Sequence, residues 1–263
     1  MKLLVKIGGS LLDEPARQAR IAVQLAQIAR EHQTAIVHGG GKQVTRFLEA
    51  QGIESSFVNG MRVSDAAVID AVTKVIAGSV NKNLVAALIA AGQPAVGISG
   101  VDGLLTSAVQ LAPEMEFVGR PDRSDARLLN LLVTSGYLPV VACIAGDSTG
   151  AIFNVNADQM AVSCAAGWQA DKLIFLTDVP GVKNARGDVL PRLATSDVRE
   201  LISDGVAHGG MQAKLEAASS ALASNVAEVI IASGDEPNVC SRLLTGEALG
   251  TRLIAEGEKA LHA

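Results

Sequence analysis

Aromatic residues are scarce in this chain, which has five Phe, one Tyr and one Trp among 263 residues. Ala, Val, Leu and Ile must therefore fill most of the core. That composition suits a sheet covered by helices on both faces, in which buried strands are rich in β-branched residues. Apolar residues make up 49% of the chain, so a sizeable core can form, and the length allows one large domain or two small ones.

Paired cysteines, basic runs and uninterrupted apolar runs are also missing. The three cysteines, Cys143, Cys164 and Cys240, show no Cys-x-x-Cys spacing, which argues against a disulfide framework or a zinc site. The formal net charge of −5 argues against nucleic acid or an anionic membrane as the main partner. No apolar stretch long enough to span a bilayer is free of polar residues. We expect a soluble, cytoplasmic protein that binds a small molecule.

Several common catalytic motifs are absent as well. Neither Gly-x-x-x-x-Gly-Lys-Ser/Thr nor Gly-x-Gly-x-x-Gly occurs at a strand–helix turn, so a P-loop NTPase or a dinucleotide-binding protein lacks its usual support. His-Glu-x-x-His and Gly-x-Ser-x-Gly are missing too, and the four histidines are scattered. Metalloprotease and serine-hydrolase activities are therefore not favoured.

What the chain does contain is an alternation of short apolar strands and amphipathic helices. Strands are predicted at 3–7, 34–37, 94–98, 138–144, 172–176, 228–232 and 251–254. Helices are predicted at 15–30, 42–51, 65–92, 124–135, 159–166, 196–203, 211–224 and 238–244, the third of them broken or bent near Gly78 and Ser79. Hairpins are predicted at 57–63, 104–118 and 188–190. No low-complexity linker occurs, so a boundary near residue 170 would divide two lobes within continuous packing.

Two glycine-rich turns lie between strands and helices near the start of the chain. Lys6 belongs to an apolar strand that opens into Gly8 and Gly9, and Gly39 to Gly41 follow the next strand. Backbone N–H groups at such turns can cradle phosphate. Lys is rarely buried without a partner, so its place in a strand favours a functional role for Lys6. Each glycine group taken alone could simply permit a positive φ angle.

Further polar residues follow other predicted strands and turns. These are Arg62, Asn154, Asn156, Asp158, Thr177, Asp178 and, after a third glycine pair, Lys214. Ligands of open α/β sheets bind outside the carboxyl ends of the strands, so these residues predict an anion site rich in donors. Arg62 could instead be a solvated surface charge, and either aspartate could be a helix cap or turn former. Lys214 could be exposed in the first turn of a helix, although a cation there opposes the helix dipole.

Six segments in order along nearly the whole chain resemble one known family. They are Lys-Ile-Gly-Gly-Ser, Val-His-Gly-Gly-Gly, Val-Asn-Gly-Met-Arg-Val-Ser, Asn-Val-Asn-Ala-Asp, Leu-Thr-Asp-Val-Pro-Gly-Val and Gly-Gly-Met-x-x-Lys. This set is similar to the N-acetyl-L-glutamate kinases, the arginine-biosynthesis branch of the amino-acid kinase superfamily. The resemblance implies an α/β fold, a three-layer αβα sandwich around a mainly parallel open sheet. It also implies an N-terminal lobe, 1–170, for the acyl-amino acid and dimerisation, and a C-terminal lobe, 171–263, for ATP.

The implied reaction transfers phosphate from ATP to the side-chain carboxylate of N-acetyl-L-glutamate. This acceptor is already ionised at neutral pH, so no general base is needed. The difficulty is repulsion between two anions, which positioned cations and N–H groups relieve. The resemblance implies that Lys6 and Lys214 neutralise the transferring group from two sides, that Asp158 holds both ammonium groups, and that Gly8, Gly9 and Gly40 donate N–H groups to the phosphoryl oxygens.

The resemblance also implies two sets of binding residues. The substrate would contact Gly40, Gly41, Arg62, Asn154 and Asn156, with Arg62 paired to the free α-carboxylate and Asn156 in a supporting role. ATP would be bordered by Gly8, Gly9, Thr177, Asp178, Val179, Pro180, Gly181, Val182, Gly210, Met211 and Lys214. Mg²⁺ would be carried mainly by the nucleotide phosphates, with no dedicated protein ligands. His38 and Cys143 are expected to be structural.

The chain departs from the common wording of the family at two positions. Val101 stands where Lys is frequent, and His208 stands where Thr often precedes the late Gly-Gly-Met. The first predicted strand starts at residue 3, without the additional N-terminal helix of the arginine-inhibited hexameric members, so we expect a homodimer that is insensitive to arginine.

Other assignments remain open. One is a related kinase acting on a carrier-protein-linked aminoadipate, and aspartokinase, glutamate 5-kinase and uridylate kinase are further candidates. A non-catalytic metabolite-binding module would be expected to lack Lys6, Lys214 or Asp158, and all three are present.

Overall fold

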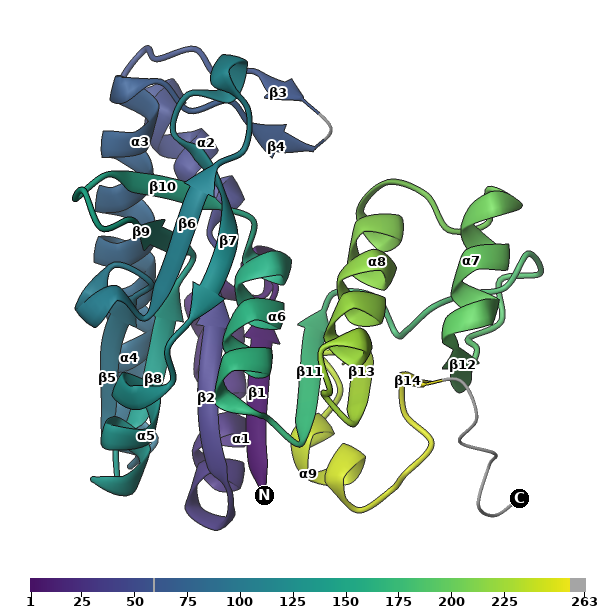
Figure 1. Ribbon diagram of the computed structural model, residues 1–263. Helices are drawn as coiled ribbons and strands as arrows, with labels where there is room; N and C mark the ends of the chain where they lie inside the picture. Colours follow the sequence, from purple (N-terminus) through teal and green to yellow (C-terminus); the bar gives the residue numbers. More distant parts are fainter. Residues whose placement is uncertain (59, 256–263) are drawn as a thin grey trace.

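An eight-stranded sheet runs through the protein (Figure 1). The computed structural model describes residues 1–58 and 60–255. The strand order is β12-β14-β13-β11-β1-β2-β8-β5. The bounds are β1 Lys2–Ile7, β2 Gln33–His38, β5 Ala95–Ser99, β8 Leu138–Ala142, β11 Lys172–Thr177, β12 Arg192–Ala194, β13 Glu228–Ser233 and β14 Thr251–Ile254. All neighbours are parallel except β13 and β14, so the predicted mainly parallel open sheet is confirmed.

Helices cover both faces of this sheet. The bounds are α1 Pro15–Glu31, α2 Gly41–Ala50, α3 Ala66–Val72, α4 Asn81–Ala90, α5 Arg127–Thr134, α6 Ala157–Trp168, α7 Thr195–Ser203, α8 Gly209–Ala223 and α9 Val239–Leu244. In Figure 1, α6 and α8 lie in front of the sheet and α1 lies behind it. Leu3, Leu4, Phe175 and Trp168 are among the largest fully buried side chains. The core therefore lies between the sheet and its two helical layers, as the αβα expectation requires.

The long helix between α2 and β5 was predicted to be broken or bent near Gly78 and Ser79. It is not broken, and the irregularity at this place is a π-helical segment. Residues Ala66–Ala90 form one helix in which Thr73–Val80 adopts π-helical turns. π-helical turns of this kind are rare, and those that occur are frequently at functional sites. This helix has the length and apolar composition of a membrane-crossing segment. Leu84 and Leu88 are fully buried in the core, which accounts for much of that apolar character.

A small closed barrel is inserted between α4 and α6. It consists of β6 Thr106–Gln110, β7 Val118–Ser124, β9 Ile144–Gly146 and β10 Ile152–Val155. The predicted hairpin at 104–118 exists, but its second strand starts where the prediction ended it. The following helix starts later than predicted because β7 continues to Ser124, whose hydroxyl bonds that of Thr106 at 2.8 Å. The predicted strand at 138–144 is divided at Cys143 into β8 and β9.

A two-stranded hairpin extends from the top of the molecule in Figure 1. It pairs β3 Phe57–Val58 with β4 Met61–Arg62. Asn59 of the predicted Asn-Gly turn lies outside the described residues, and Gly60 has a φ of 76°. The carboxyl ends of β1, β2 and β11 point towards the space below this hairpin, and the predicted site residues gather there.

Candidate active site

Lys6, Asp158 and Lys214 come together from three elements. Lys6 lies near the carboxyl end of β1, Asp158 in the first turn of α6, and Lys214 in the second turn of α8. The Lys6 Nζ atom is 2.7 Å from Asp158 Oδ1, and Lys214 Nζ donates to Asp158 Oδ2 at 2.9 Å. The exposed fractions of the three side chains are 10%, 12% and 13%. The predicted convergence of two ammonium groups on one carboxylate is confirmed.

Two cations and one anion leave this cluster with surplus positive charge. Burial acts to raise the pKa of Asp158, but the charges of Lys6 and Lys214 hold it below its ordinary value. Burial, followed by the charge of Lys6, lowers the pKa of Lys214, while Asp158 acts in the opposite direction. Lys214 also lies 5.6 Å from the centroid of the Phe175 ring. Because unmatched buried charge is costly, the cluster is suited to an anionic ligand.

The two early glycine turns lie against each other beside this cluster. The 3₁₀ helix Gly9–Leu12 begins at Gly9, and α2 begins at Gly41. The first N–H groups of a helix have no intrahelical acceptor. In the described part of the chain, the N–H groups of Gly9, Gly40 and Gly41 donate to no acceptor. A Cβ atom added to Gly9 would lie 3.7 Å from the nitrogen of Gly40. Two helix starts therefore present free donors at one place.

Gly8 does not have the role expected of it. Its N–H donates to the carbonyl oxygen of Leu176 at 2.8 Å, which continues the hydrogen bonding between β1 and β11. A Cβ atom on Gly8 would lie 3.3 Å from that same oxygen. The expectation that its N–H faces a phosphoryl group is therefore wrong for this structure. Gly8 instead permits the close approach of the ends of β1 and β11.

Arg62 is buried, with 6% of its surface exposed. Its guanidinium donates to the hydroxyl of Ser55, to the hydroxyl of Thr45 at 2.6 Å and to the carbonyl of Gly41 at 3.2 Å. It also lies 4.5 Å from the centroid of the Phe57 ring. Burial lowers the pKa of this guanidinium. Its low exposure shows that the solvated-charge alternative is wrong. No carboxylate pairs with it among residues 1–58 and 60–255, so the guanidinium can bind an anionic ligand.

Arg62 lines a cavity of about 170 Å³ next to the glycine turns. The cavity walls combine polar and apolar groups, namely Gly39 to Gly41, Phe57, Met61, Val72, Ile76, Val118, Cys143, and Asn154 to Ala157. Ile76 and Val80 of the π-helical segment lie so close to Gly40 that a Cβ there would be 3.2 Å from Val80. The cavity can therefore hold a small molecule with an anionic end and an apolar group.

Asn154 and Asn156 both line this cavity but are bonded differently. Asn154 Nδ2 donates to the hydroxyl of Ser64 at 3.0 Å, which leaves its carbonyl oxygen available. Asn156 caps α6, because its side-chain oxygen accepts the N–H groups of Asp158 and Gln159 at 2.8 and 3.2 Å. The supporting role expected for Asn156 is thus a cap that holds the helix carrying Asp158.

The predicted nucleotide residues lie on the other side of the cluster. Thr177 ends β11 and is buried, and its hydroxyl donates to the Asp178 carboxylate at 3.2 Å. Asp178 and Pro180 are exposed and Val179 is half-buried. Burial acts to raise the pKa of Asp178, but its own N–H, Ser10, Thr177 and Arg17 together lower it. This loop therefore presents both backbone and carboxylate groups to solvent.

Gly181 and Val182 pack differently from the rest of this loop. Val182 is buried, and its N–H donates to the hydroxyl of Thr251 at 2.8 Å. A Cβ on Gly181 would lie 2.8 Å from the same hydroxyl, and its φ of 158° is unfavourable for other residues. These two residues anchor the loop to β14 and therefore have a structural role.

The start of α8 completes the nucleotide side. Gly210 is exposed and its N–H has no acceptor in the described part of the chain, whereas that of Met211 donates to the His208 carbonyl at 3.3 Å. His208 occupies the N-cap position without a side-chain hydrogen bond. Because α8 begins at Gly209, Lys214 lies in its second turn. Its side chain is half-buried, so the alternative of an exposed lysine in the first turn is wrong.

His38 and Cys143 are buried beneath the glycine turns, in agreement with a structural role. Burial lowers the pKa of His38 to about 4 and raises that of the Cys143 thiol to about 12. His38 contacts the Gly39 carbonyl at 2.9 Å and the Asn81 amide at 3.0 Å. Both side chains are therefore uncharged near neutral pH.

Sequence reasoning missed the side chains that hold these groups in place. Thr45 and Ser55 fix Arg62, Gln43 donates to the Gly9 carbonyl at 3.4 Å, and Arg17 donates to the Ser10 carbonyl at 3.1 Å. None of them belongs to a recognisable local motif. Their contacts come from elements that are distant in the sequence or from a loop.

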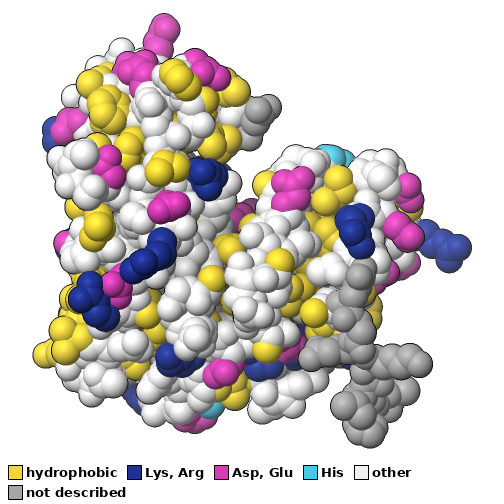
Figure 2. Space-filling view, viewed as in Figure 1, with side chains coloured by type: hydrophobic (Ala, Val, Ile, Leu, Met, Phe, Trp, Pro, Cys, Tyr) yellow, Lys and Arg dark blue, Asp and Glu magenta, His cyan; other side chains and the backbone are white. Residues whose placement is uncertain are grey.

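The surface above the cluster is hollowed between two parts of the molecule. Figure 2 shows the taller part, which carries β3, β4 and α2, separated by a cleft from the lower part with α7 and α8. The lysine cluster joins these parts, since β1 and α6 belong to the first and α8 to the second. A ligand at the cluster would therefore contact both.

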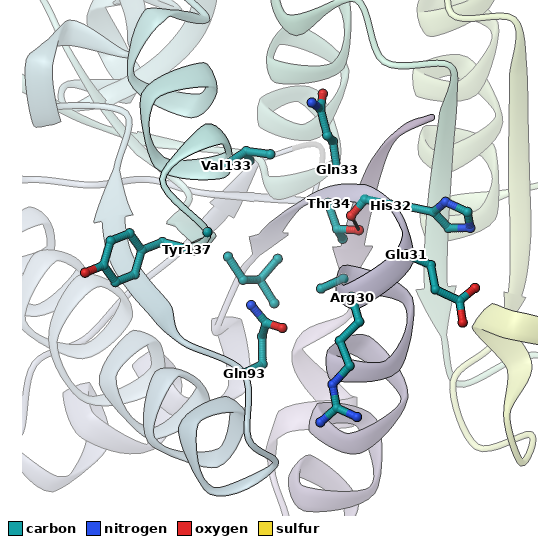
Figure 3. A pocket seen from close by; sticks show the side chains of 11 residues that line it. Arg30, Glu31, His32, Gln33, Thr34, Gln93, Val133 and Tyr137 are labelled. Atoms are coloured by element: carbon teal, nitrogen blue, oxygen red, sulfur yellow. Dashed lines mark hydrogen bonds between the residues drawn. The ribbon is translucent and has the colours of Figure 1, made fainter.

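A second hollow, of about 270 Å³, lies at the opposite end of the strands, where β2 and β8 begin. It is lined by the ends of α1 and α5 and by the start of β2. Figure 3 shows Tyr137, Arg30 and His32 directed away from one another. Polar groups that diverge cannot act on one ligand atom, so this hollow lacks the convergent arrangement of the lysine cluster.

The sequence profile of the amino acid kinase family matches residues 1–233. The chain belongs to the amino acid kinase family.

Similar proteins share one narrower name. The acetylglutamate kinase of Solibacter usitatus (strain Ellin6076) is 54% identical over 255 residues, which cover 97% of this chain and 99% of that protein. The acetylglutamate kinase of Acidobacterium capsulatum is 42% identical over 262 residues, 97% of this chain and 100% of that protein. This chain is therefore a kinase.

Solved structures share the fold at lower identity. N-acetylglutamate synthase from Neisseria gonorrhoeae, complexed with coenzyme A and N-acetyl-glutamate, has a TM-score of 0.85 and 24% identity. The match covers 99% of this chain and 60% of that chain. The likeness supports the α/β fold alone.

Proposed function

We propose that this protein transfers the terminal phosphate of ATP to the side-chain carboxylate of N-acetyl-L-glutamate. The product is N-acetyl-L-glutamyl 5-phosphate, an intermediate of arginine biosynthesis. The observation that carries the proposal is the pair of ammonium groups, on side chains that are 10% and 13% exposed, that contact the single carboxylate of Asp158. The acetylglutamate kinases that are 54% and 42% identical supply the choice of acceptor.

The transfer needs charge compensation more than proton transfer. The acceptor carboxylate is ionised at neutral pH, so it attacks phosphorus directly while ADP leaves on the opposite side. Lys6 and Lys214 offset the negative charge on the phosphoryl oxygens, and Asp158 keeps both lysines aligned. The free N–H groups of Gly9 and Gly40 donate to the same oxygens. These donors are already in position, so little reorganisation opposes the reaction.

The acceptor occupies the cavity beside Arg62. The guanidinium pairs with the α-carboxylate, because it is buried and has no acidic partner among the described residues. The free carbonyl oxygen of Asn154 accepts the amide N–H of the acetamido group, and Gly40 and Gly41 border the side-chain carboxylate. Apolar side chains of the cavity, such as Val118, contact the acetyl methyl group.

ATP binds along the loop from Thr177 to Gly181 and the start of α8. The N–H of Gly210 and the helix dipole favour phosphate there. No cluster of three His, Cys, Asp or Glu side chains suited to a metal occurs in the part of the chain that the structure describes. We assign Mg²⁺ mainly to the nucleotide phosphates, whose charge it would reduce. Residues 1–170 then form the acceptor lobe and residues 171–263 the nucleotide lobe.

A second copy of this chain is proposed to cover the edge strand β5. Ile89, Leu131 and Tyr137 are 57%, 61% and 45% exposed, and they come from α4, α5 and the turn before β8, which flank this edge. Residues 95–98 of this edge strand are half-buried, and exposed apolar side chains beside a strand edge favour association. Light scattering tests the homodimer. A cytoplasmic location fits the acidic chain and its metabolic substrate.

The test of the function is a coupled ADP-release assay with N-acetylglutamate, glutamate and aspartate offered side by side. We expect turnover with N-acetylglutamate and much less with the two free amino acids. Preference for glutamate would instead favour a glutamate 5-kinase, and preference for aspartate an aspartokinase. Activity only with a carrier-protein-linked aminoadipate would select the remaining kinase alternative.

A further inference from the structure

Arg17, in the first turn of α1, contacts two segments that are far apart in the chain. Its Nε donates to Asp235 Oδ1 at 2.6 Å, and its Nη2 contacts the other oxygen of the same carboxylate. Its Nη1 donates to the carbonyl oxygen of Ser10 at 3.1 Å. One guanidinium therefore joins the turn after β1 to the loop after β13. This paired, planar contact is specific to arginine.

The loop that carries Asp235 is itself tied to the strand between them. The N–H of Gly234 donates to the carbonyl of Thr177 at 2.8 Å, at the end of β11. A Cβ atom on Gly234 would lie 2.5 Å from the Leu11 side chain, so a larger residue there would force Leu11 to move. Because β13, β11 and β1 are neighbours in the sheet, Arg17 closes a chain of contacts across three strand ends.

These contacts fix the orientation of the first glycine turn. The Ser10 carbonyl is held by Arg17, and the N–H of the same peptide, from Leu11, donates to the Gly8 carbonyl at 3.0 Å. The preceding peptide is held by Gln43 at the Gly9 carbonyl. The Gly9 N–H belongs to the peptide of the Gly8 carbonyl, and that carbonyl accepts the Leu11 N–H. Arg17 therefore acts on the direction of the Gly9 N–H through one intervening hydrogen bond.

The same guanidinium also offsets negative charge. Asp178 and Asp235 both lie near it, and the hydrogen bond to Asp235 is the main cause that raises the pKa of Arg17. The charge of Arg17 is one of the influences that lower the pKa of Asp178. Without Arg17, the carboxylate of Asp235 would lose its partner and that of Asp178 one of its two neighbouring cations, and both would repel a polyphosphate bound at this loop more strongly.

We propose that Arg17 is a positioning residue for phosphoryl transfer, which orients the Gly9 turn and screens the carboxylates of Asp178 and Asp235 from the nucleotide. This inference rests on the proposed function. It predicts two separable effects, because orientation needs the planar fork of Arg and screening needs only its charge. Geometry errors at a phosphoryl group affect kcat, whereas charge repulsion affects nucleotide affinity.

The test compares Arg17→Ala, Arg17→Lys and Asp235→Asn with Arg242→Ala as the matched control. Arg242 makes a similar two-contact pair with Glu247 in α9 and the following turn. We expect Arg17→Ala to lower kcat and raise the KM for ATP, each by about tenfold. Arg17→Lys should recover the KM but not kcat. Asp235→Asn should leave the KM for ATP unchanged or lower, and Arg242→Ala should change the melting temperature alone.

The overturning result is an Arg17→Ala enzyme that loses thermal stability like Arg242→Ala but keeps kcat and both KM values. Calorimetric binding of a non-hydrolysable ATP analogue with Mg²⁺ separates this inference from the proposed function. If the unaltered protein does not phosphorylate N-acetylglutamate, the proposed function fails. The screening role is still supported if Arg17→Ala binds the analogue about tenfold more weakly than the unaltered protein does. Equal affinities would overturn that role.

Discussion

The acceptor side and the nucleotide side of the cleft are built in different ways. On the acceptor side, the charged group is Arg62, 6% exposed and held by three oxygen atoms within a walled cavity. On the nucleotide side, Asp178, Pro180 and Gly210 are exposed, and the contacts available are largely backbone. The acceptor side is thus preorganised by packing, and its specificity should depend on side chains. The nucleotide side should tolerate side-chain changes better, because backbone N–H groups do not depend on residue type.

The lysine cluster lies between the acceptor side and the nucleotide side. Its removal should therefore affect the transfer itself, whichever ligand is varied. Lys6→Met or Lys214→Met should lower kcat by about 10³-fold or more, because the remaining lysine is balanced by Asp158 and no surplus positive charge is left for the phosphoryl group. Single-turnover rates under saturating substrates measure the effect. Lys74→Met, which breaks an exposed pair with Asp70, is the control and should keep full activity. A loss below tenfold for both lysines would contradict their catalytic role.

Arg62→Lys sharpens the comparison from the acceptor side. We expect the KM for N-acetylglutamate to rise by about 100-fold, because an ammonium cannot reproduce the two-pronged contact with a carboxylate. The KM for ATP should stay within about twofold. Arg46→Lys, on the exposed face of α2, is the control. If the KM for ATP rose instead, the acceptor would have been placed on the wrong side of the cluster.

The pH dependence of the cluster tests its electrostatics. Burial and Lys6 lower the pKa of Lys214, so the lysine loses its proton, and kcat declines, at a lower pH than for an exposed lysine. The sign for stability is opposite. Burying the protonated form costs stability, and this cost is relieved as pH rises through the lowered pKa. Lys214→Arg should keep its charge and move the alkaline decline in kcat to higher pH. An unchanged profile would exclude Lys214 as its source.

The smallest effects are expected at Asn156 on the acceptor side and at Asp178 on the nucleotide side. Asn156→Ala removes the cap of α6 and should cost about 1 kcal/mol of stability, with a modest loss of kcat. Asp178→Asn on the exposed nucleotide loop should change the KM for ATP by less than about fivefold. Thermal melts and steady-state kinetics measure both. An Asn156→Ala loss of activity as large as that of Lys6→Met would mean that Asn156 touches the reacting groups.

Local pattern was enough to predict most of the sheet. The apolar runs that became β1, β2, β11 and β13 are buried on both faces, so their composition alone separates them from their surroundings. The short strands β10 and β12 were not predicted, although β14, which is as short as β10, was. The helix at 66–90 was predicted to break or bend at small residues, and local pattern did not indicate its π-helical turns, whose Val80 and Ile76 side chains lie close to Gly40.

The identity of the reactive groups could be inferred from the sequence because the chemistry demands particular residue types. Lysines, glycine turns and one aspartate in a fixed order are readable from the chain itself, and they indicated an anion site rich in donors. Phosphoryl transfer to a carboxylate was implied by the resemblance to the N-acetyl-L-glutamate kinases. The sequence could not show which N–H groups remain free, how deeply Arg62 is buried, or that Arg17 meets Asp235 across 218 positions. Hydrogen bonds and burial depend on contacts between distant segments, which exist only once parallel strands place their carboxyl ends side by side. The residues of the site were therefore set by the sequence, whereas their charge balance and free donors were decided by the tertiary structure.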